Sequence, residues 1–351
     1  MNDRFIKACR RERSDATPVW FMRQAGRFLP EYRKIRKTHS LIEICKDPEL
    51  CAEVSTLPVN ILGVDAAILF ADIMLPLEGM GVKFDITDGV GPVISSSLND
   101  FERVNSLTPL EPDSDVPYVM EAISATKKLL DSRVPLIGFC GAPFTLASYL
   151  IEGHATREFV KTKKLMYRNP ETWHLLMDKL STSMGTYLRA QVNAGVDAVQ
   201  VFDSWAGCLS PADYHTYVLP YSQRVFSYLN DRTIPRIHFG TGTAMLLEEM
   251  RQAGGDVFGI DWRIPIDVAW QKLGYDVAIQ GNLDPIVLMA ETDLIRAKTV
   301  DILTRVGDRA GHIFNLGHGI LPETPQENVR QLVQFVHEHT KSTREWKFPS
   351  A

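Results

Sequence analysis

Short apolar runs alternate with longer stretches of helical pattern along most of the chain. The runs are rich in Val, Ile and Phe, and helix-start signals such as Asp47-Pro48 and Ser210-Pro211 fall between them. Continuous apolar strands separated by helices are typical of a parallel sheet that is covered on both faces. The eight candidate strands are PVWFM (18–22), AAILF (66–70), PLIGFC (135–140), AVQVFD (198–203), PRIHFG (235–240), VFGID (257–261), VAIQGN (277–282) and HIFNLG (312–317). Eight such units predict an α/β fold, a single (β/α)8 TIM-type barrel.

The stretch from 72 to 115 interrupts this alternation. Its sequence VKFDITDGVGPVI is typical of a β-hairpin that turns at Asp88 and Gly89, and a loop rich in Ser and Pro follows. We therefore expect a hairpin insertion after an early strand. Because α/β barrels often exceed about 250 residues, the pattern predicts a single barrel domain over the whole range 1–351.

Three stretches with the same pattern distinguish the two ends of the barrel. They are GVDAAILFAD (63–72), GVDAVQVFDS (195–204) and GGDVFGID (254–261), in which a glycine ends a helix and an aspartate precedes a strand. The aspartates at the strand starts, expected to be structural, are Asp65, Asp197 and Asp256. The polar residues at the opposite ends, where barrel enzymes keep their chemistry, are Asp72, Asp203, Ser204, His238, Asp261, Asn282, Asp284, Asn315 and His318.

These strand-end residues disfavour two kinds of chemistry. They include no lysine, which a Schiff-base enzyme would need. Imidazole and carboxylate groups are common ligands of metal ions, and the candidates here are His238, Asp203, Asp261 and His318. Their spacing matches no recognised metal motif, and none of the four lies in an H-x-H or H-E-x-x-H motif. We therefore expect no metal site.

Composition excludes several classes of partner. A formal net charge of -5 argues against nucleic-acid binding, which needs a basic surface. The five cysteines include no C-x-x-C pair, so a reducing, cytoplasmic setting is expected. The N-terminus has no apolar segment of the signal-peptide type. The uncharged run 134–151 is interrupted by Pro and Gly, which favours strand, turn and helix over a membrane span.

The strongest local signal is PVWFMRQAGRFLPEYRKIRK (18–37), in which an apolar strand is followed by six cationic residues. Arg23 and Arg27 lie four positions apart on either side of Gly26. Guanidinium groups bind carboxylates through two parallel hydrogen bonds, so this pair suits a ligand with several acid groups. The alternative is a solvated helix face paired with Glu31, which explains Lys34 and similar outer residues.

Asp72 is unusual because it follows the apolar run AAILF and precedes Ile73, Met74 and Leu75. An ionised carboxylate in such surroundings loses hydration and needs a cation or several hydrogen-bond donors. A structural partner such as an arginine is one possibility. The other is a substrate that supplies the donors.

Seven longer motifs follow one another along nearly the whole chain. They are PVWFMRQAGRFLPEYR (18–33), FADI (70–73), GFCGAPFTLASYLIEG (138–153), FDSWAG (202–207), GIDWR (259–263), QGNLDP (280–285) and NLGHGI (315–320). In this order the motifs resemble the uroporphyrinogen decarboxylase family of haem biosynthesis. That family converts the four acetate side chains of uroporphyrinogen III to methyl groups and so gives coproporphyrinogen III. One departure is Phe28, where many members carry tyrosine.

The resemblance implies a single (β/α)8 barrel in the cytoplasm, usually a homodimer, that binds a porphyrinogen and uses no metal or organic cofactor. It implies that Asp72 stabilises the transition state and that Arg23 and Tyr149 are further catalytic candidates. The residues implied to contact the substrate are Arg23, Gln24, Ala25, Gly26, Arg27, Arg36, Asp72, Tyr149, Ser204 and His318.

Two other functions are compatible with parts of this pattern. A corrinoid-dependent zinc methyltransferase of the same superfamily would need a His-x-Cys pair, whereas His238-Phe239-Gly240 stands at the comparable strand end. A non-catalytic tetrapyrrole carrier would need the arginines and an apolar cleft but no central carboxylate. The presence of Asp72 favours the decarboxylase, because its carboxylate would accept the pyrrole N–H donors and stabilise the positive charge that forms when the ring is protonated.

Overall fold

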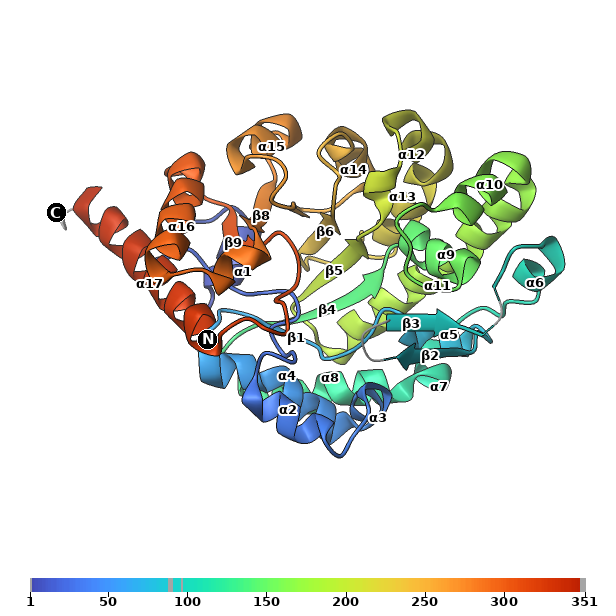
Figure 1. The fold of residues 1–351 in the computed structure, drawn as a ribbon, viewed down its shortest axis with the longest axis horizontal. Coiled ribbons are helices and arrows are strands. Elements are labelled where there is room, and N and C mark those ends of the chain that lie inside the picture. Colours follow the sequence, from blue (N-terminus) through green and yellow to red (C-terminus); the bar gives the residue numbers. More distant parts are fainter. Residues whose placement is uncertain (1, 88–90, 96, 348–351) are drawn as a thin grey trace.

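The computed structural model describes residues 2–87, 91–95 and 97–347, and a curled parallel sheet surrounded by helices dominates it (Figure 1). Each strand pairs in parallel with the next one of the sheet, in the order β1-β4-β5-β6-β7-β8-β9. The strands are β1 (Ala67–Ile68), β4 (Leu136–Gly141), β5 (Ala198–Asp203), β6 (Arg236–Gly240), β7 (Val257–Gly259), β8 (Ala278–Leu283) and β9 (His312–Leu316). Seven of the eight predicted runs are thus confirmed as strands of a TIM-type sheet.

The eighth run, 18–22, differs from the prediction. It forms only an isolated parallel bridge, between Val19 and Phe314 of β9. The reason lies at Phe21, whose N–H donates to the Gln24 side chain and whose carbonyl accepts from the Gln24 N–H, so neither group is left for a strand partner. On its other side the run contacts the segment that leads into β1, because the Asp65 N–H donates to the Val19 carbonyl over 2.8 Å. This short segment therefore lies between the two edge strands of the sheet.

The three strand-start aspartates fix the alignment of neighbouring strands. In each case the aspartate N–H donates to a carbonyl of the preceding strand, and its carboxylate accepts the N–H of the same residue. The pairs are Asp65 with Val19, Asp197 with Leu136 and Asp256 with Arg236. A shift of one residue would break both bonds, so the structural role predicted for these aspartates is confirmed.

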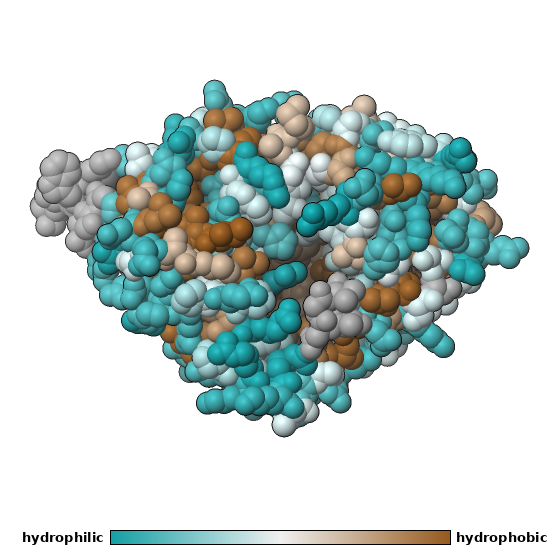
Figure 2. Space-filling view, in the orientation of Figure 1, coloured by the Kyte–Doolittle hydropathy of each residue, from teal (hydrophilic) through white to brown (hydrophobic). Residues whose placement is uncertain are grey.

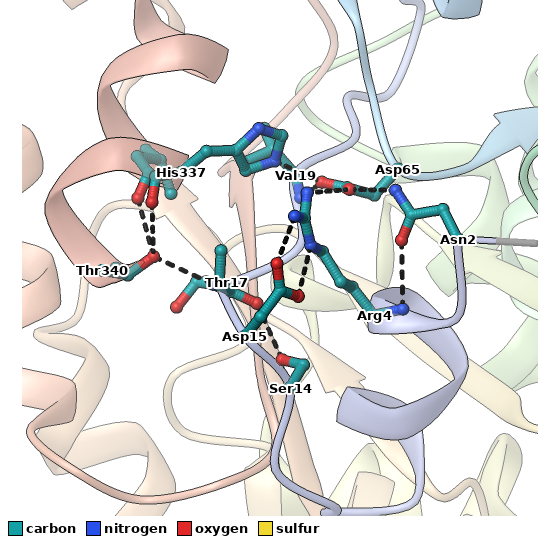
Figure 3. Close-up of polar contacts among 11 residues, drawn as sticks. Asn2, Arg4, Ser14, Asp15, Thr17, Val19, Asp65, His337 and Thr340 are labelled. Atoms are coloured by element: carbon teal, nitrogen blue, oxygen red, sulfur yellow. Dashed lines mark hydrogen bonds and ion pairs between the residues drawn. The ribbon is translucent and has the colours of Figure 1, made fainter. Parts of the chain in front are cut away.

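Asp65 is the most buried of the three and the most heavily bonded (Figure 3). Besides the Val19 N–H at 2.7 Å, its carboxylate contacts Asn2 Nδ2 at 2.6 Å, Arg4 Nη1 at 3.3 Å and His337 Nε2 at 2.6 Å. These partners come from both ends of the chain. The N-terminal segment and the C-terminal helix are thus both attached to the start of the segment that leads to Arg23.

Helices cover the outer face of the sheet and supply the outer core. The longer ones are α4 (Pro48–Leu62), α8 (Pro117–Leu130), α9 (Pro143–Glu152), α10 (Val160–Arg168), α11 (Pro170–Ala194), α13 (Leu219–Ser227), α15 (Ile266–Leu273), α16 (Thr292–Val306) and α17 (Gln326–Lys347). The shorter ones are α1 (Arg4–Cys9), α2 (Pro30–Arg36), α3 (Leu41–Lys46), α5 (Leu75–Gly79), α6 (Phe101–Asn105), α7 (Pro112–Asp115), α12 (Pro211–Tyr217), α14 (Leu247–Ala253), η1 (Ala206–Cys208) and η2 (Pro285–Met289). The predicted caps Asp47 and Ser210 accept N–H groups of α4 and α12.

A second core fills the inside of the curled sheet. It consists of strand residues such as Ile137, Ile237 and Ile313 together with Phe5 of α1. Two polar bonds cross this interior: Trp20 Nε1 donates to Gln280, and Gln280 donates to Gln200. The interior below the strand ends is therefore filled, and space for a ligand is left only above it.

The predicted hairpin insertion is confirmed. Strand β2 (Phe84–Thr87) pairs antiparallel with β3 (Gly91–Ile94), while the expected turn at Asp88 and Gly89 lies outside the described residues. Strand β3 of the hairpin contacts the end of α9, where the Ile94 N–H donates to the Gly153 carbonyl over 2.8 Å.

The uncharged run 134–151 forms β4 and most of α9, as predicted. Within the part of the chain that the structure describes, no helix combines the length and the apolar character needed to cross a membrane.

Replacing Asp65 should destabilise the fold more than replacing its counterpart Asp256. Asp65→Ala leaves the buried Val19 N–H without an acceptor and removes the carboxylate contacts of Asn2, Arg4 and His337, and we expect it to lower the free energy of unfolding by about 3 kcal/mol. Asp256 has the same backbone geometry, but its side chain is 40% exposed, so Asp256→Ala should cost about 1 kcal/mol. Urea unfolding followed by circular dichroism measures both. Equal losses of unfolding free energy in the two variants would contradict the conclusion that the buried contacts of Asp65 stabilise the fold more than those of Asp256.

Candidate functional site

A cavity of about 560 Å³ opens at the C-terminal end of the strands. Figure 2 shows a hollow near the centre of this face, with hydrophilic side chains around its opening. Residues 22–27, the segment after β1, the ends of β4 to β6, the β2–β3 hairpin and the loop after β9 line the cavity. The cavity brings together all ten residues predicted for the site: Arg23, Gln24, Ala25, Gly26, Arg27, Arg36, Asp72, Tyr149, Ser204 and His318.

The floor of the cavity is aromatic. Phe139 of β4, Phe202 of β5 and Phe239 of β6 stand in a row, with edge-to-face ring contacts at centroid distances of 5.3 and 5.8 Å. These three residues are not among those predicted from the sequence. The signal was present, because each is a large apolar residue one or two positions before the end of its strand. An apolar floor with polar groups at the rim suits a large, flat ligand with charged edges.

The arginine segment rests on two glycines. Arg23 has a left-handed backbone (φ 59°), and an added Cβ at Gly26 would lie 2.7 Å from the Arg23 carbonyl oxygen. The stem of Arg23 covers Gly319, where a Cβ would lie 2.4 Å from Arg23 Cδ. Both Arg23 and Arg27 are exposed, and neither forms a hydrogen bond or ion pair through its guanidinium with a described residue. Their charges therefore remain available to a ligand.

Gln24 differs from its arginine neighbours. Its side chain is fully buried, with Nε2 donating to the Ala66 carbonyl and Oε1 accepting from the Phe21 N–H, both over 3.0 Å. The amide that the sequence analysis assigned to substrate contact is thus occupied by backbone groups. Gln24 holds the segment in the bend that presents Arg23 and Arg27 to the cavity.

Asp72 lies on the cavity wall just after β1. One carboxylate oxygen accepts from the Met74 N–H over 2.9 Å, and no described residue forms an ion pair with it. Burial raises the pKa of Asp72, whereas the Met74 N–H and the charge of Arg23 act in the opposite direction. The sequence left two explanations for Asp72: an arginine partner within the protein, or a substrate that supplies the donors. Among the described residues, the structure shows no arginine paired with this carboxylate.

The other strand-end carboxylates already have partners. Asp203 Oδ1 accepts from the Thr145 hydroxyl over 3.1 Å, while the buried Oδ2 forms no hydrogen bond with a described residue. Asp261 accepts from the Gly242 and Arg263 N–H groups and pairs with the Arg263 guanidinium. Because these donors come from the protein itself, Asp203 and Asp261 serve to connect neighbouring units.

The histidines and acids considered as metal ligands do not form one cluster, although His238 Nε2 and Asp203 Oδ2 lie 3.9 Å apart. His238 is fully buried against Phe226 and Phe258, with ring centroids 5.2 and 6.3 Å away, and does not line the cavity. Among the residues that the structure describes, no three His, Cys, Asp or Glu side chains are placed to share a metal ion.

His318 presents a neutral donor. Its Nδ1 accepts the Gly319 N–H over 2.7 Å, so the proton of the neutral ring sits on Nε2. Burial lowers the pKa of His318 to about 4, with the charges of Arg23 and Arg263 adding to the effect. At neutral pH the ring is therefore an uncharged hydrogen-bond donor.

Tyr149 is the second neutral donor, on α9. Its ring stacks on Trp205 with centroids 3.8 Å apart. Burial raises the pKa of Tyr149 to about 12, and Asp72 raises it while Arg23 lowers it. The hydroxyl is thus protonated at neutral pH, and the three candidates Arg23, Asp72 and Tyr149 lie close enough to influence one another's charge. Trp205 and Thr145, which also line the cavity, were not found from the sequence.

The chain has close relatives of known name. A family model described as uroporphyrinogen decarboxylase matches residues 1–339. The protein named uroporphyrinogen decarboxylase from Carboxydothermus hydrogenoformans is 54% identical over 338 residues, which are 96% of this chain and 97% of the relative. Its namesake from Thermus thermophilus is 53% identical over 338 residues, covering 96% of this chain and 98% of the relative.

Solved structures agree with the fold. A methyltransferase from Methanosarcina mazei superposes with a TM-score of 0.81 at 22% identity, covering 96% of this chain and 98% of the other. A B12-independent methionine synthase from Shewanella sp. W3-18-1 gives a TM-score of 0.60 at 10% identity, covering 89% and 91%. At such identities the similarity concerns the fold alone.

The low pKa of His318 predicts a pH-dependent loss of stability. The unfolded chain binds a proton near pH 6.5, but the folded protein does so only near pH 4, so the contribution is complete above pH 6.5 and is lost as pH falls toward 4. We expect wild-type protein to lose about 1–2 kcal/mol more than His318→Gln across this window. Urea unfolding between pH 4 and 7 measures it, with the exposed His154→Gln as the control variant. An unchanged slope in His318→Gln would contradict the assignment.

Proposed function

The chain belongs to the uroporphyrinogen decarboxylase family, and from this premise we propose that it decarboxylates uroporphyrinogen III. Each of the four acetate side chains becomes a methyl group, and the product is coproporphyrinogen III, on the route to haem. The observation that carries the proposal is Asp72, a partly buried carboxylate on the cavity wall with no cation paired to it.

The substrate would supply the donors that Asp72 lacks. A porphyrinogen directs four pyrrole N–H groups toward its centre, and a single carboxylate accepts them. These bonds favour the ionised form of Asp72 and offset the burial that raises its pKa in the free protein. The ring then lies against the aromatic floor formed by Phe139, Phe202 and Phe239.

The reaction follows from this placement. Protonation of a pyrrole carbon spreads positive charge over the ring, and the fixed anion of Asp72 stabilises that charge more than it stabilises the neutral ring. The bond between the acetate methylene and its carboxylate then breaks, carbon dioxide leaves, and the electron pair flows into the pyrrole. A proton adds to the exocyclic carbon to complete the methyl group, and the ring proton is released. The substrate ring is the electron sink, so the proposed mechanism uses no metal or organic cofactor.

The cationic rim would bind the acidic side chains of the substrate. Arg23 and Arg27 carry free guanidinium groups beside the cavity, and Arg36 of α2 lines it while donating to the His39 carbonyl over 2.7 Å. Ala25 and Gly26 place backbone next to the same edge. Paired hydrogen bonds from guanidinium to carboxylate would orient the acetates and propionates around the ring.

Neutral donors would complete the site. His318, Ser204 and Tyr149 line the cavity, and the first and last are uncharged at neutral pH. They position carboxylates by hydrogen bonds without adding charge. Arg23 and Tyr149 are also the protein groups proposed to deliver protons, with water as the alternative, because both lie near Asp72.

We further propose that the chain acts in the cytoplasm as one barrel domain and as a homodimer. The support for this proposal is the family to which the chain belongs, since the resemblance implies a homodimer of single barrels.

Two other functions receive less support. A zinc methyltransferase needs a His-x-Cys pair at the strand end, and His238-Phe239-Gly240 has no cysteine while its histidine faces Phe226 rather than the cavity. A tetrapyrrole carrier gains nothing from a partly buried Asp72 that has no cation partner among the described residues, because its desolvation costs free energy when no ligand is bound.

The function test is decarboxylation by metal-stripped protein under anaerobic conditions. Wild-type protein should remove four carboxyl groups from uroporphyrinogen, whereas Asp72→Asn should lower turnover by about 10²-fold or more, because the fixed anion is lost. Chromatography of the oxidised products counts the carboxyl groups. A requirement for added zinc would overturn the proposal.

The matched control is Asp284→Asn. Asp284 also ends a strand, but its carboxylate caps η2 and does not line the cavity, so its turnover should stay near wild type. Circular dichroism verifies the fold of both variants. Near-normal formation of coproporphyrinogen by Asp72→Asn would refute the proposed role of the carboxylate.

The guanidinium geometry gives a separate prediction. Arg27→Lys keeps the charge but loses the paired hydrogen bonds, so we expect KM for uroporphyrinogen to rise about tenfold with a smaller change in kcat. Arg296→Lys on the outer helix α16 is the control for the same exchange. Steady-state kinetics distinguish them. If the KM of Arg27→Lys equalled that of Arg296→Lys, Arg27 would not bind the carboxylates of the substrate.

A further inference from the structure

One peptide bond beside the cavity is held from both sides by threonine hydroxyls. It joins Ser204 to Trp205, in the turn that follows β5. The Thr241 hydroxyl donates to the Ser204 carbonyl, and the Trp205 N–H donates to the Thr145 hydroxyl over 3.3 Å. Both polar groups of the same peptide unit are thus fixed by side chains from neighbouring βα units.

This peptide carries two residues of the site. The Ser204 side chain and the Trp205 ring both line the cavity. The Trp205 ring in turn stacks on Tyr149, with ring centroids 3.8 Å apart and planes inclined by 30°. A rotation of the peptide would therefore displace the Ser204 hydroxyl and the support of Tyr149 together.

The Thr145 side of the hold has a fixed direction. Thr145 is fully buried in the first turn of α9, and its hydroxyl donates to Asp203 Oδ1 over 3.1 Å. Asp203 is itself fully buried at the end of β5. Because the single hydroxyl proton of Thr145 points to Asp203, its oxygen is left to accept the Trp205 N–H.

The Thr241 side is held by close backbone contact. Thr241 follows β6, and an added Cβ at Gly207 would lie 2.3 Å from the Thr241 carbonyl oxygen. The turn after β5 therefore lies directly against the turn after β6. Thr241 itself does not line the cavity, so any effect it has on the substrate must pass through the peptide that it holds.

We infer that Thr145 and Thr241 are positioning residues that clamp the Ser204–Trp205 peptide and so hold the Ser204 hydroxyl and the Tyr149–Trp205 stack against the substrate. The inference rests on the proposed function, because it assigns these residues to the same porphyrinogen site. A lost hydrogen bond at a clamped group shifts a reacting geometry by a fraction of an ångström, and small misplacements of this kind slow the chemical step.

The first test removes the Thr241 hydroxyl. Thr241→Val should lower kcat/KM for uroporphyrinogen roughly tenfold, the size expected for one positioning hydrogen bond, and Thr241→Ser should restore most of it. Thr299→Val is the control, because Thr299 is a buried threonine of α16 whose hydroxyl donates to the Ile295 carbonyl. Its kcat/KM should stay near wild type. Equal activity of Thr241→Val and Thr299→Val would overturn the inference.

A double-mutant cycle separates positioning from general destabilisation. If Thr241 acts through Ser204, then Thr241→Val combined with Ser204→Ala should be no slower than the slower single variant by more than about twofold. The same Thr241→Val combined with Arg27→Lys should give the product of the two single effects. Multiplicative losses in both pairs, and also when Thr241→Val is combined with Tyr149→Phe, would show that Thr241 acts through neither group that the peptide supports and would overturn the clamp.

Failure of the clamp and failure of the proposed function give different results. Wild-type protein that forms no coproporphyrinogen refutes the function itself, whereas active wild type with an unaffected Thr241→Val refutes only the clamp. If Thr241→Val does not fold by circular dichroism, Thr241→Ala repeats the test without the extra methyl group. The expected result for that variant is the same roughly tenfold loss.

Discussion

The contact between the buried Asp65 carboxylate and the backbone of Val19 is the constraint on which the rest of the structure depends. The segment that contains Val19 closes the curled sheet with a single bridge to β9, so strand pairing alone holds it weakly. Asp65 fixes its start through two backbone hydrogen bonds, and the next residue, Ala66, fixes its end by accepting from Gln24. Two successive residues thus hold both ends of the segment. Arg23 lies between those ends, which places fold closure and substrate binding in the same short stretch of chain.

Much of this architecture follows from the hydrophobic pattern, and the exceptions have local physical causes. The pattern identifies seven strands and the aspartates that align them, since continuous apolar runs and repeated Gly-x-Asp signals are properties of the sequence itself. It overestimates the first strand because nothing in the residue order reveals that Gln24 takes both backbone groups of Phe21. The same bond explains why Gln24 is more informative as a structural residue than as a ligand contact. Residue type suggests an amide donor, but only the fold shows where the amide points.

The candidate site illustrates the same limit for charge. Asp72, Asp203 and Asp261 are all acids that follow apolar strands in the sequence, and Asp72 is separated beforehand only by the apolar residues that follow it and by resemblance to a family. In the structure they differ by their partners. Asp203 and Asp261 receive donors from neighbouring units and do not line the cavity, although Asp203 Oδ2 forms no hydrogen bond with a described residue. Asp72 lines the cavity and accepts only from the Met74 N–H among the described residues, in surroundings that raise its pKa. A buried group left in this state is costly for stability, which is the physical reason to attribute it to a ligand rather than to the fold.

The neutral donors of the site and the clamped peptide have a related physical role. A substrate with many carboxylates binds most strongly to cations, but a site made only of arginines would repel the positive charge that forms on the ring. Keeping His318 and Tyr149 uncharged by burial lets them contact carboxylates without that penalty. Uncharged hydrogen bonds are weaker than ion pairs and depend more on geometry, so such donors need rigid support. The hydroxyls of Thr145 and Thr241 offer that support to the turn beside Tyr149, from two different βα units. The positions of the donor groups in the site therefore depend on contacts between neighbouring βα units and not on any one sequence motif.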